Sequence, residues 1–300
     1  MLNPVKQNLL RMALATIFVA FLVMGLKYAA YYLTGSVALY SDALESIVNV
    51  ITACVVWYAL RLSYKPADSD HPFGHHKAEY LSAVIEGVLI IVAALVIFHE
   101  AWAAWLNPRP LEQTTLGIGV NVLASVINGA WAYVLIRAGR QHRSPALLAD
   151  GKHILTDVVT SAAVLIGLVL AIVTGWAQLD PAMAVLVGLN ILWQGWQVIN
   201  SSVQGLMDRA AEPAEEARIR ALIGANADGA LEVHDLKTRM AARAVFIEFH
   251  LVVPEKMTVK RAHEICDRIE EAMLKSVPGS RVTIHVEPEG EAKQSGVLVI

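Results

Sequence analysis

Long apolar blocks alternate with short polar stretches over the first 208 residues, and ordinary charged sequence follows. A helix needs about twenty apolar residues to cross a bilayer, and six blocks are long enough. The pattern therefore predicts six transmembrane helices, with bounds accurate to a few residues: 9–33, 37–62, 81–105, 116–136, 147–175 and 181–207.

The periodicity after residue 208 is that of a small soluble domain. It predicts helices over 215–223 and 258–275, the second capped by Thr258, and strands over 233–239, 245–253 and 281–286. This order is typical of an α+β layer. We therefore expect a transmembrane domain at 1–208, a cytoplasmic domain at 209–290 and a flexible tail at 291–300.

Composition and charge narrow the class of protein. The chain is 56% hydrophobic and only 17% charged, which indicates a membrane protein rather than an ordinary soluble one. A net charge of -3 argues against a nucleic-acid partner. Cys54 and Cys266 fall in different predicted domains, so no disulfide framework is expected. The first apolar block is too long for a signal-peptide core and is expected to remain as a span.

The basic residues of the first domain gather at alternate ends of the predicted spans. The opposite loops contain a single basic residue, Arg109. By the positive-inside rule both termini are expected in the cytoplasm. The basic set consists of Lys6, Arg11, Arg61, Lys65, Lys77, Arg137, Arg140 and Arg143.

Two predicted spans carry polar side chains at helical spacing. Glu45 and Asn49 are four residues apart in one span, and His153 and Asp157 are four apart in another, so each pair shares a helix face. An aspartate at the centre of a span costs about 2.5 to 3.5 kcal/mol, which helix propensity does not explain. The alternative to a functional role is that these groups pair with one another, or with Lys27, to hold the bundle.

Carboxylate, amide and imidazole ligands suit a divalent cation of borderline hardness, such as Zn²⁺, Fe²⁺, Co²⁺ or Mn²⁺. Because the same groups bind protons, metal entry expels protons. Exchange of this kind is the chemistry of an antiporter. Asp42, one turn before Glu45, is a possible extra ligand.

Two further groups of residues could bind metal outside the spans. Asp68, His71 and His75 lie in the loop between the second and third spans and suffice for a three-ligand zinc-type site; a solvated polar loop is the alternative. The soluble domain has several candidates spread over three predicted strands and a helix, each of which could also be an ordinary residue of its type. They are His234, His250, His263, His285 and Glu287.

Several motifs together resemble the cation diffusion facilitators, and most closely the bacterial zinc and ferrous-iron efflux pumps. They are the six-span layout, Gly-Ser-Val-Ala-Leu at 35–39, Pro-Ala-Asp at 66–68 with Phe-Gly-His at 73–75 and Lys-Ala-Glu at 77–79, the His153 and Asp157 pair, and Leu-Met-Asp-Arg-Ala at 206–210. The resemblance covers about residues 5–288.

The resemblance implies a homodimer in the bacterial inner membrane that exports Zn²⁺, Fe²⁺ or a similar divalent cation from the cytoplasm in exchange for protons. The implied transport ligands are Glu45, Asn49, His153 and Asp157. The implied loop ligands are Asp68, His71 and His75. A binuclear site in a ferredoxin-like cytoplasmic domain is implied at His234, His250, His263, His285 and Glu287. An implied salt bridge between Lys77 and Asp208 locks the membrane and soluble parts together.

Three positions depart from the family pattern. Glu45 and Asn49 stand where that branch usually has two aspartates, and Glu287 replaces a third. Asn49 removes a formal negative charge unless Asp42 supplies one, so the site should bind cations more weakly, and the identity of the metal stays open.

Two other classes of function remain as alternatives. One is a membrane-anchored metal sensor or assembly protein, in which the tail binds metal and the bundle moves nothing. The other is an exporter of organic cations, which predicts aromatic residues around the carboxylates. An enzyme is not expected, because no nucleophile-and-base constellation stands out. No prosthetic group is expected either, and divalent metal is both substrate and regulatory ligand.

Overall fold

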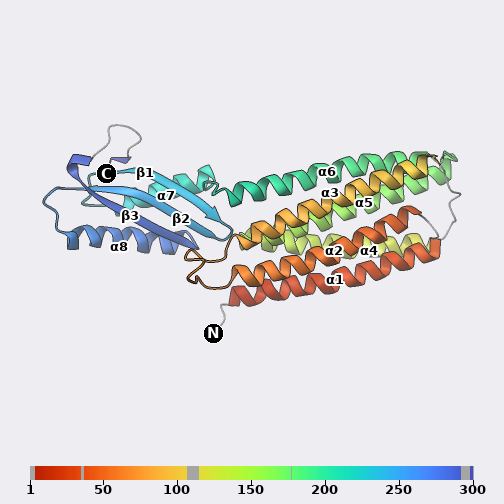
Figure 1. Ribbon diagram of the computed structural model, residues 1–300, viewed down its shortest axis with the longest axis horizontal. Helices are drawn as coiled ribbons and strands as arrows, with labels where there is room; N and C mark the ends of the chain where they lie inside the picture. The colour runs from red at the N-terminus through yellow and green to blue at the C-terminus, as the bar shows by residue number, and fades with distance from the viewer. Residues whose placement is uncertain (1–3, 35–36, 107–114, 177, 292–297, 300) are drawn as a thin grey trace. The chain divides into compact units, whose positions relative to one another are not determined.

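The computed structural model describes residues 4–34, 37–106, 115–176, 178–291 and 298–299 (Figure 1). The chain divides into two compact units, Met1–Val203 and Gln204–Ile300. The first unit is helical, and the second contains a sheet with two helices.

All six predicted spans form helices, and most extend beyond the predicted bounds by a few residues. They are α1 (Pro4–Thr34), α2 (Val37–Ser63), α3 (Ala78–Leu106), α4 (Thr115–Gln141), α5 (Pro145–Thr174) and α6 (Leu179–Leu206). Among the described residues, four segments are long and apolar enough to cross a membrane: Asn8–Leu33, Glu45–Ser63, Ala78–Leu106 and Thr115–Gln141.

Helix α5 packs against α2, α3 and α4, so it brings its polar face next to the polar face of α2. Glycines let α3 and α6 approach closely. A Cβ on Gly87 would lie 2.6 Å from Cγ1 of Ile199 and 3.1 Å from the carbonyl oxygen of Gly195. Small residues are the usual means by which membrane helices come close together.

The second unit has the predicted α+β layer. Its elements are α7 (Pro213–Asn226), β1 (Glu232–Ala241), β2 (Ala244–Val253), α8 (Val259–Ser276), β3 (Ser280–Pro288) and β4 (Leu298–Val299), with a short 3-10 helix at Glu289–Glu291. The strand order is β3-β2-β1-β4, with β2 antiparallel to β1 and parallel to β3. The Thr258 side chain caps α8, as predicted, by accepting from the Arg261 amide at 3.3 Å.

Two residues of the segment predicted as a flexible tail lie in a strand, and the flexibility of that segment stays a prediction. Leu298 and Val299 form β4, which pairs with the open edge of β1. Backbone pairing at a sheet edge does not require an apolar run, which explains why the sequence pattern did not predict it. Residues 292–297 and 300 of that segment lie outside the described part.

The sheet buries one face under α7 and α8. Alternate residues of β2, from Val245 through Phe249 to Val253, join isoleucines of both helices in one core. Because strand residues alternate between faces, His250 points to the opposite face. Any site built around His250 is therefore on the face that these helices leave uncovered.

Candidate metal sites

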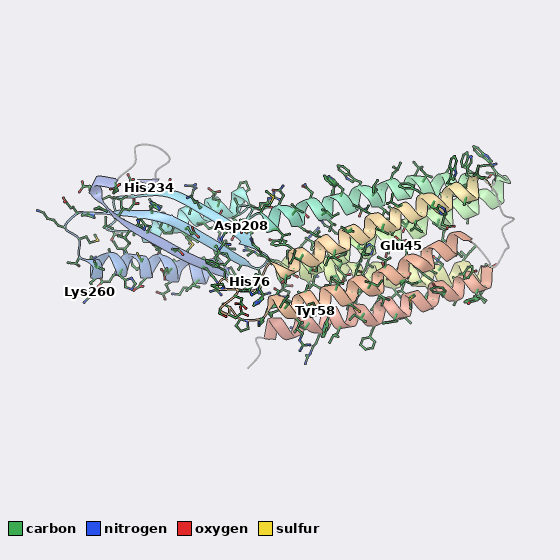
Figure 2. All side chains as sticks on the ribbon, in the orientation of Figure 1. Glu45, Tyr58, His76, Asp208, His234 and Lys260 are labelled. Atoms are coloured by element: carbon green, nitrogen blue, oxygen red, sulfur yellow. The ribbon has the colours of Figure 1, made fainter. Side chains whose placement is uncertain are left out.

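Four predicted ligands gather inside the helical unit, on α2 and α5. Glu45 and Asn49 are each 6% exposed, His153 is 2% exposed, and Asp157 is fully buried (Figure 2 labels Glu45). The Asn49 amide donates a hydrogen bond to Asp157 Oδ2, and His153 Nδ1 lies 3.6 Å from Asp157 Oδ1. These side chains face one another across the two helices rather than pointing out of the bundle.

Several atoms of this group have no hydrogen-bond partner among the described residues. They are Glu45 Oε1, Asn49 Oδ1, Asp157 Oδ1 and both ring nitrogens of His153. Buried polar atoms are normally hydrogen-bonded, and leaving one unpaired costs about 1–3 kcal/mol. A cation would give a partner to the lone pairs of the oxygens and to that of one imidazole nitrogen. Within the described residues, however, Glu45, His153 and Asp157 do not bring three ligand atoms within 4.8 Å of one another, so binding requires their side chains to close in.

Asp42 is not part of this open group. Its carboxylate accepts from Lys27 Nζ at 2.7 Å, from Asn121 Nδ2 at 2.9 Å and from Ser161 Oγ at 2.9 Å. Lys27 is fully buried and Asp42 is 4% exposed. The alternative that these groups pair with Lys27 to hold the bundle therefore applies to Asp42, because the Lys27 ammonium group on α1 already neutralises its charge.

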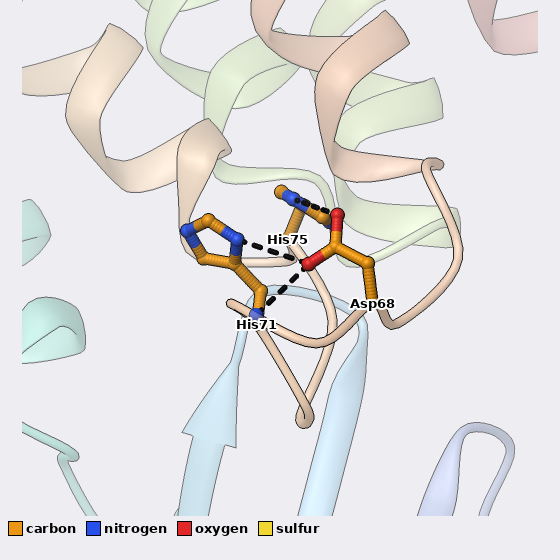
Figure 3. Close-up of side chains that lie close together, drawn as sticks. All are labelled: Asp68, His71 and His75. Carbon is orange, nitrogen blue, oxygen red and sulfur yellow. Dashed lines mark hydrogen bonds and ion pairs between the residues drawn. The ribbon is translucent and has the colours of Figure 1, made fainter.

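The loop residues Asp68, His71 and His75 converge, with ligand atoms within 4.8 Å of one another (Figure 3), and their role as metal ligands stays a prediction. Asp68 Oδ1 accepts from the His71 backbone amide at 2.9 Å and lies 3.2 Å from His71 Nδ1. Asp68 Oδ2 lies 3.5 Å from His75 Nε2. Gly74, with φ of +87°, makes the turn that returns the chain between the two histidines.

Lys65 competes with any metal at this loop. Its Nζ lies 2.6 Å from Asp68 Oδ2. The hydrogen bond from Lys65, followed by that from the His71 backbone, holds the pKa of the half-buried Asp68 carboxyl well below its usual range. Asp68 therefore stays ionised to lower pH than an ordinary aspartate does.

Replacing Lys65 by alanine is expected to tighten metal binding at the loop. The ammonium group no longer occupies Asp68 Oδ2, and removing one exposed ion pair should improve the dissociation constant about two- to fivefold. Titration of Co²⁺ into the purified protein, followed by its absorption, measures the change. Lys256→Ala, in the other unit, is the matched control, and weaker binding in Lys65→Ala would contradict the competition.

The candidate ligands of the second unit form a row across three strands. His234 on β1 is paired in register with His250 on β2, and His250 with His285 on β3. Glu287 reaches this row, with Oε2 at 3.1 Å from His234 Nε2 and Oε1 at 2.7 Å from His250 Nδ1. Three imidazoles and a carboxylate are a donor set that suits zinc or a similar ion.

Sequence reasoning did not select two acidic neighbours of this row. Glu232 Oε1 lies 2.9 Å from His234 Nδ1, and Asp235 forms a metal-capable group with His234 and His250. An irregularity in β1 between His234 and Lys237, with Asp235 at φ of +51°, interrupts the strand alternation there. Simple alternation would have sent Asp235 to the other face, so the pattern gave no signal for it.

His263 lies apart from the row within one chain. It is 73% exposed at its side chain on α8, and its Nε2 is 3.6 Å from Asp267 Oδ1, one turn along the same helix. The sequence alone did not separate it from the other histidines. Its role in a binuclear site stays a prediction.

The salt bridge implied between Lys77 and Asp208 also stays a prediction, since the two residues belong to different units. Within the second unit, Asp208 Oδ1 lies 3.3 Å from Arg239 Nη1 (Figure 2 labels Asp208).

Comparison with known proteins gives consistent matches over nearly the whole chain. Residues 13–207 match the family described as "Cation efflux transmembrane domain", and residues 211–289 match "Cation efflux protein, cytoplasmic domain". The uncharacterised transporter sll1263 of Synechocystis sp. is 46% identical over 281 residues, which are 94% of this chain and 91% of that protein. The cation-efflux pump FieF of Salmonella paratyphi A is 32% identical over 278 residues, covering 93% and 92% of the two chains. A solved chain of CzrB in its zinc form is 51% identical, covers 29% of this chain and 99% of its own length, and has a TM-score of 0.28.

A helical domain with buried metal-capable groups, followed by an α+β domain, defines a multi-pass membrane transporter with a cytoplasmic C-terminal domain. The chain belongs to the cation efflux family, the cation diffusion facilitators. It is therefore a transporter rather than an enzyme, and its C-terminal domain is of the family's dimerisation type.

Proposed function

We propose that the protein exchanges a divalent transition-metal cation, Zn²⁺ or Fe²⁺ in the first place, for protons across a bacterial inner membrane, and exports the metal from the cytoplasm. The observation that carries the proposal is the set of buried atoms on Glu45, Asn49, His153 and Asp157 that have no hydrogen-bond partner within the described parts of the chain. Buried polar groups of this kind in a membrane span mark ion pathways. The relative FieF is named as a cation-efflux pump, which supports the direction of transport.

The donor set explains why the cargo exchanges with protons. Imidazole nitrogen and carboxylate oxygen bind either a metal ion or a proton, but not both at one lone pair. Metal arriving from the cytoplasm displaces protons from His153, Asp157 and Glu45. On the other side, protons driven inward compete for the same atoms and release the metal. Alternating access between the two sides needs only that the bundle reorient around this one site.

The proposal is tested with protein reconstituted in liposomes that enclose a pH-sensitive dye. Adding Zn²⁺ or Fe²⁺ to one side is expected to move protons in the opposite direction, and more steeply as the metal gradient rises. Protein-free liposomes and liposomes with Ca²⁺ in place of the transition metal are the controls. Absence of metal-driven proton movement would rule out the antiport.

The membrane-anchored sensor is the alternative from another class, because the second unit has metal-capable groups of its own. It predicts metal binding without movement. A counterflow experiment distinguishes the transporter from the sensor. Liposomes that contain unlabelled metal, with no net metal gradient, take up labelled metal if the protein transports it. They exclude the labelled metal if the protein is only a sensor.

Asn49 is expected to set the metal preference. The Asn49 amide donates a hydrogen bond to Asp157, which an ionised aspartate at position 49 could not do. Because asparagine is neutral, the site has one negative charge fewer than it would have with an aspartate there. Asn49→Asp is therefore expected to tighten Zn²⁺ binding by about tenfold or more and to change the ranking among Zn²⁺, Fe²⁺ and Mn²⁺. Calorimetric titration of each metal measures this, with Asn128→Asp on α4 as the control. An unchanged ranking would mean that Asn49 does not choose the metal.

The histidine row of the second unit is proposed to bind cytoplasmic metal and to favour the dimer. His250 and His285 meet across β2 and β3, with ring centroids 4.9 Å apart, and a metal held there would rigidify the uncovered face of the sheet. His250→Ala with His285→Ala is expected to remove the dependence of dimerisation on metal, measured by analytical ultracentrifugation with and without Zn²⁺. A metal response equal to that of the wild type would leave this unit without a regulatory role. The exposed His263→Ala provides a comparison on α8.

A further inference from the structure

Two more acidic side chains are buried in the helical unit. Glu86 on α3 and Asp150 on α5 are each 1% exposed. Neither carboxylate oxygen of Glu86 has a hydrogen-bond partner among the described residues, and the same is true of Oδ2 of Asp150. A carboxylate within a membrane span costs at least a few kcal/mol, so its presence without a partner calls for a functional reason.

Contacts between α3 and α5 fix how the two helices are aligned. At their first turns, Glu79 of α3 accepts a hydrogen bond from Ser144, the N-cap of α5. Further along, Ala83 of α3 packs with Ala149 of α5. The two helices therefore run in the same direction, and residues with larger numbers on each lie progressively deeper from their common starting end.

This alignment places Glu86 and Asp150 at one level. Glu86 follows Ala83 by three residues on the same face of α3, and Asp150 comes directly after Ala149. The Glu86 carboxylate interacts electrostatically with Asp150 and with Asp157. No cation is paired with Glu86 or Asp150 among the described residues, in contrast to Asp42 with its buried lysine.

The next level along α5 is the proposed transport site. Asp150, His153 and Asp157 are spaced by three and four residues, so they follow one face of the helix. A cavity of about 30 Å³ lies beside His153 and is also lined by Ile90, one turn after Glu86 on α3. It is large enough for one water molecule or ion. Glu86 and Asp150 therefore lie nearer the beginning of α3 and α5 than the imidazole and the cavity beside it.

We propose that Glu86 and Asp150 form an entry station, which binds the divalent cation one helical turn before it reaches His153 and Asp157. The inference rests on the proposed function and adds a second ion position to it. Carboxylate oxygens attract a hydrated cation and replace part of its water. Without an imidazole they hold a transition metal less firmly than the deeper site, so the ion passes inward.

The test compares Glu86→Gln and Asp150→Asn with the wild type in liposomes, by the initial rate of transport against Zn²⁺ concentration on the side where α3 and α5 begin. Each variant is expected to raise KM by about tenfold with little change in the maximal rate, because the deeper site is intact. The KM of the double variant is expected to be no more than about twice that of either single variant, because both residues bind the same ion. Glu86→Asp, which keeps the charge, is expected to restore KM.

Glu79→Gln is the matched control on α3. Glu79 is equally buried, at 1%, but its oxygens accept hydrogen bonds from Ser63 and Ser144. Its replacement is expected to lower thermal stability without raising KM. If the wild type transports and KM is unchanged in Glu86→Gln and Asp150→Asn, the entry station is wrong and the antiport stands.

Two other results would also decide the matter. An altered number of protons per metal with unchanged KM would assign the carboxylates to protons and overturn the metal station. A wild type that moves no metal would instead overturn the proposed function itself.

Discussion

The double variant His153→Ala with Asp157→Ala is expected to lower metal-driven proton flux by about 100-fold or more. Loss of a residue that only supports a metal ligand already costs about 10- to 100-fold in affinity or activity, and this variant removes two proposed ligands. The imidazole and the carboxylate lie 3.6 Å apart with side chains no more than 1% exposed, so bulk solvent does not replace the two lost ligands.

The chain provides a matched control for this variant. His99 and Glu100 on α3 form another imidazole–carboxylate pair, also 3.6 Å apart, but the His99 side chain is 80% exposed. His99→Ala with Glu100→Ala is expected to keep the flux within about twofold, as is usual for exposed substitutions away from a site. Both proteins are compared in the same liposomes with the same dye. Full flux in the His153 and Asp157 variant would remove the transport site from these two helices.

Hydropathy and helical spacing account for much of what the sequence predicted. The six helices follow from apolar blocks of membrane length, and the facing of His153 with Asp157 follows from a separation of four residues on one helix. Both are local properties of the chain. They do not depend on contacts with other parts of the molecule.

Contacts between residues far apart in the sequence could not be predicted from these local patterns. Asp42 was a candidate ligand because it is one turn from Glu45. In the structure its carboxylate instead accepts hydrogen bonds from Lys27 on α1 and Asn121 on α4. Both partners are far away in sequence, and only helix packing brings them together. Glu86 and Asp150 were not selected for a related reason, since they lie in different spans and their shared level depends on how α3 and α5 align.

In the sheet of the second unit, too, the contacts between strands could not be predicted from local sequence patterns. The sequence placed one histidine in each of three predicted strands, and the register of β1 with β2 and of β2 with β3 brings the three into one row. Register is set by the whole sheet and by its buried face. The irregularity that brings Asp235 to this row breaks the alternation on which the prediction depended.

Lys27→Met is expected to destabilise the helical unit by about 3–5 kcal/mol, because it leaves the Asp42 carboxylate charged and buried without its cation. Asn121 and Ser161 would remain as neutral donors, which cannot neutralise the charge. Thermal unfolding of the protein in detergent, followed by circular dichroism, measures the loss. Lys152→Met is the control, since Lys152 is exposed on α5 and its replacement should change stability by no more than about 0.5 kcal/mol.

The combination Lys27→Met with Asp42→Asn removes both charges and keeps the shape of the second side chain. It is expected to recover most of the lost stability, because replacing both members of a buried ion pair is far less costly than removing one. The effects of the two substitutions should then fail to add by about 0.5–3 kcal/mol. Additive effects would mean that the pair does not stabilise the bundle, and Asp42 would become available to a cation beside Glu45.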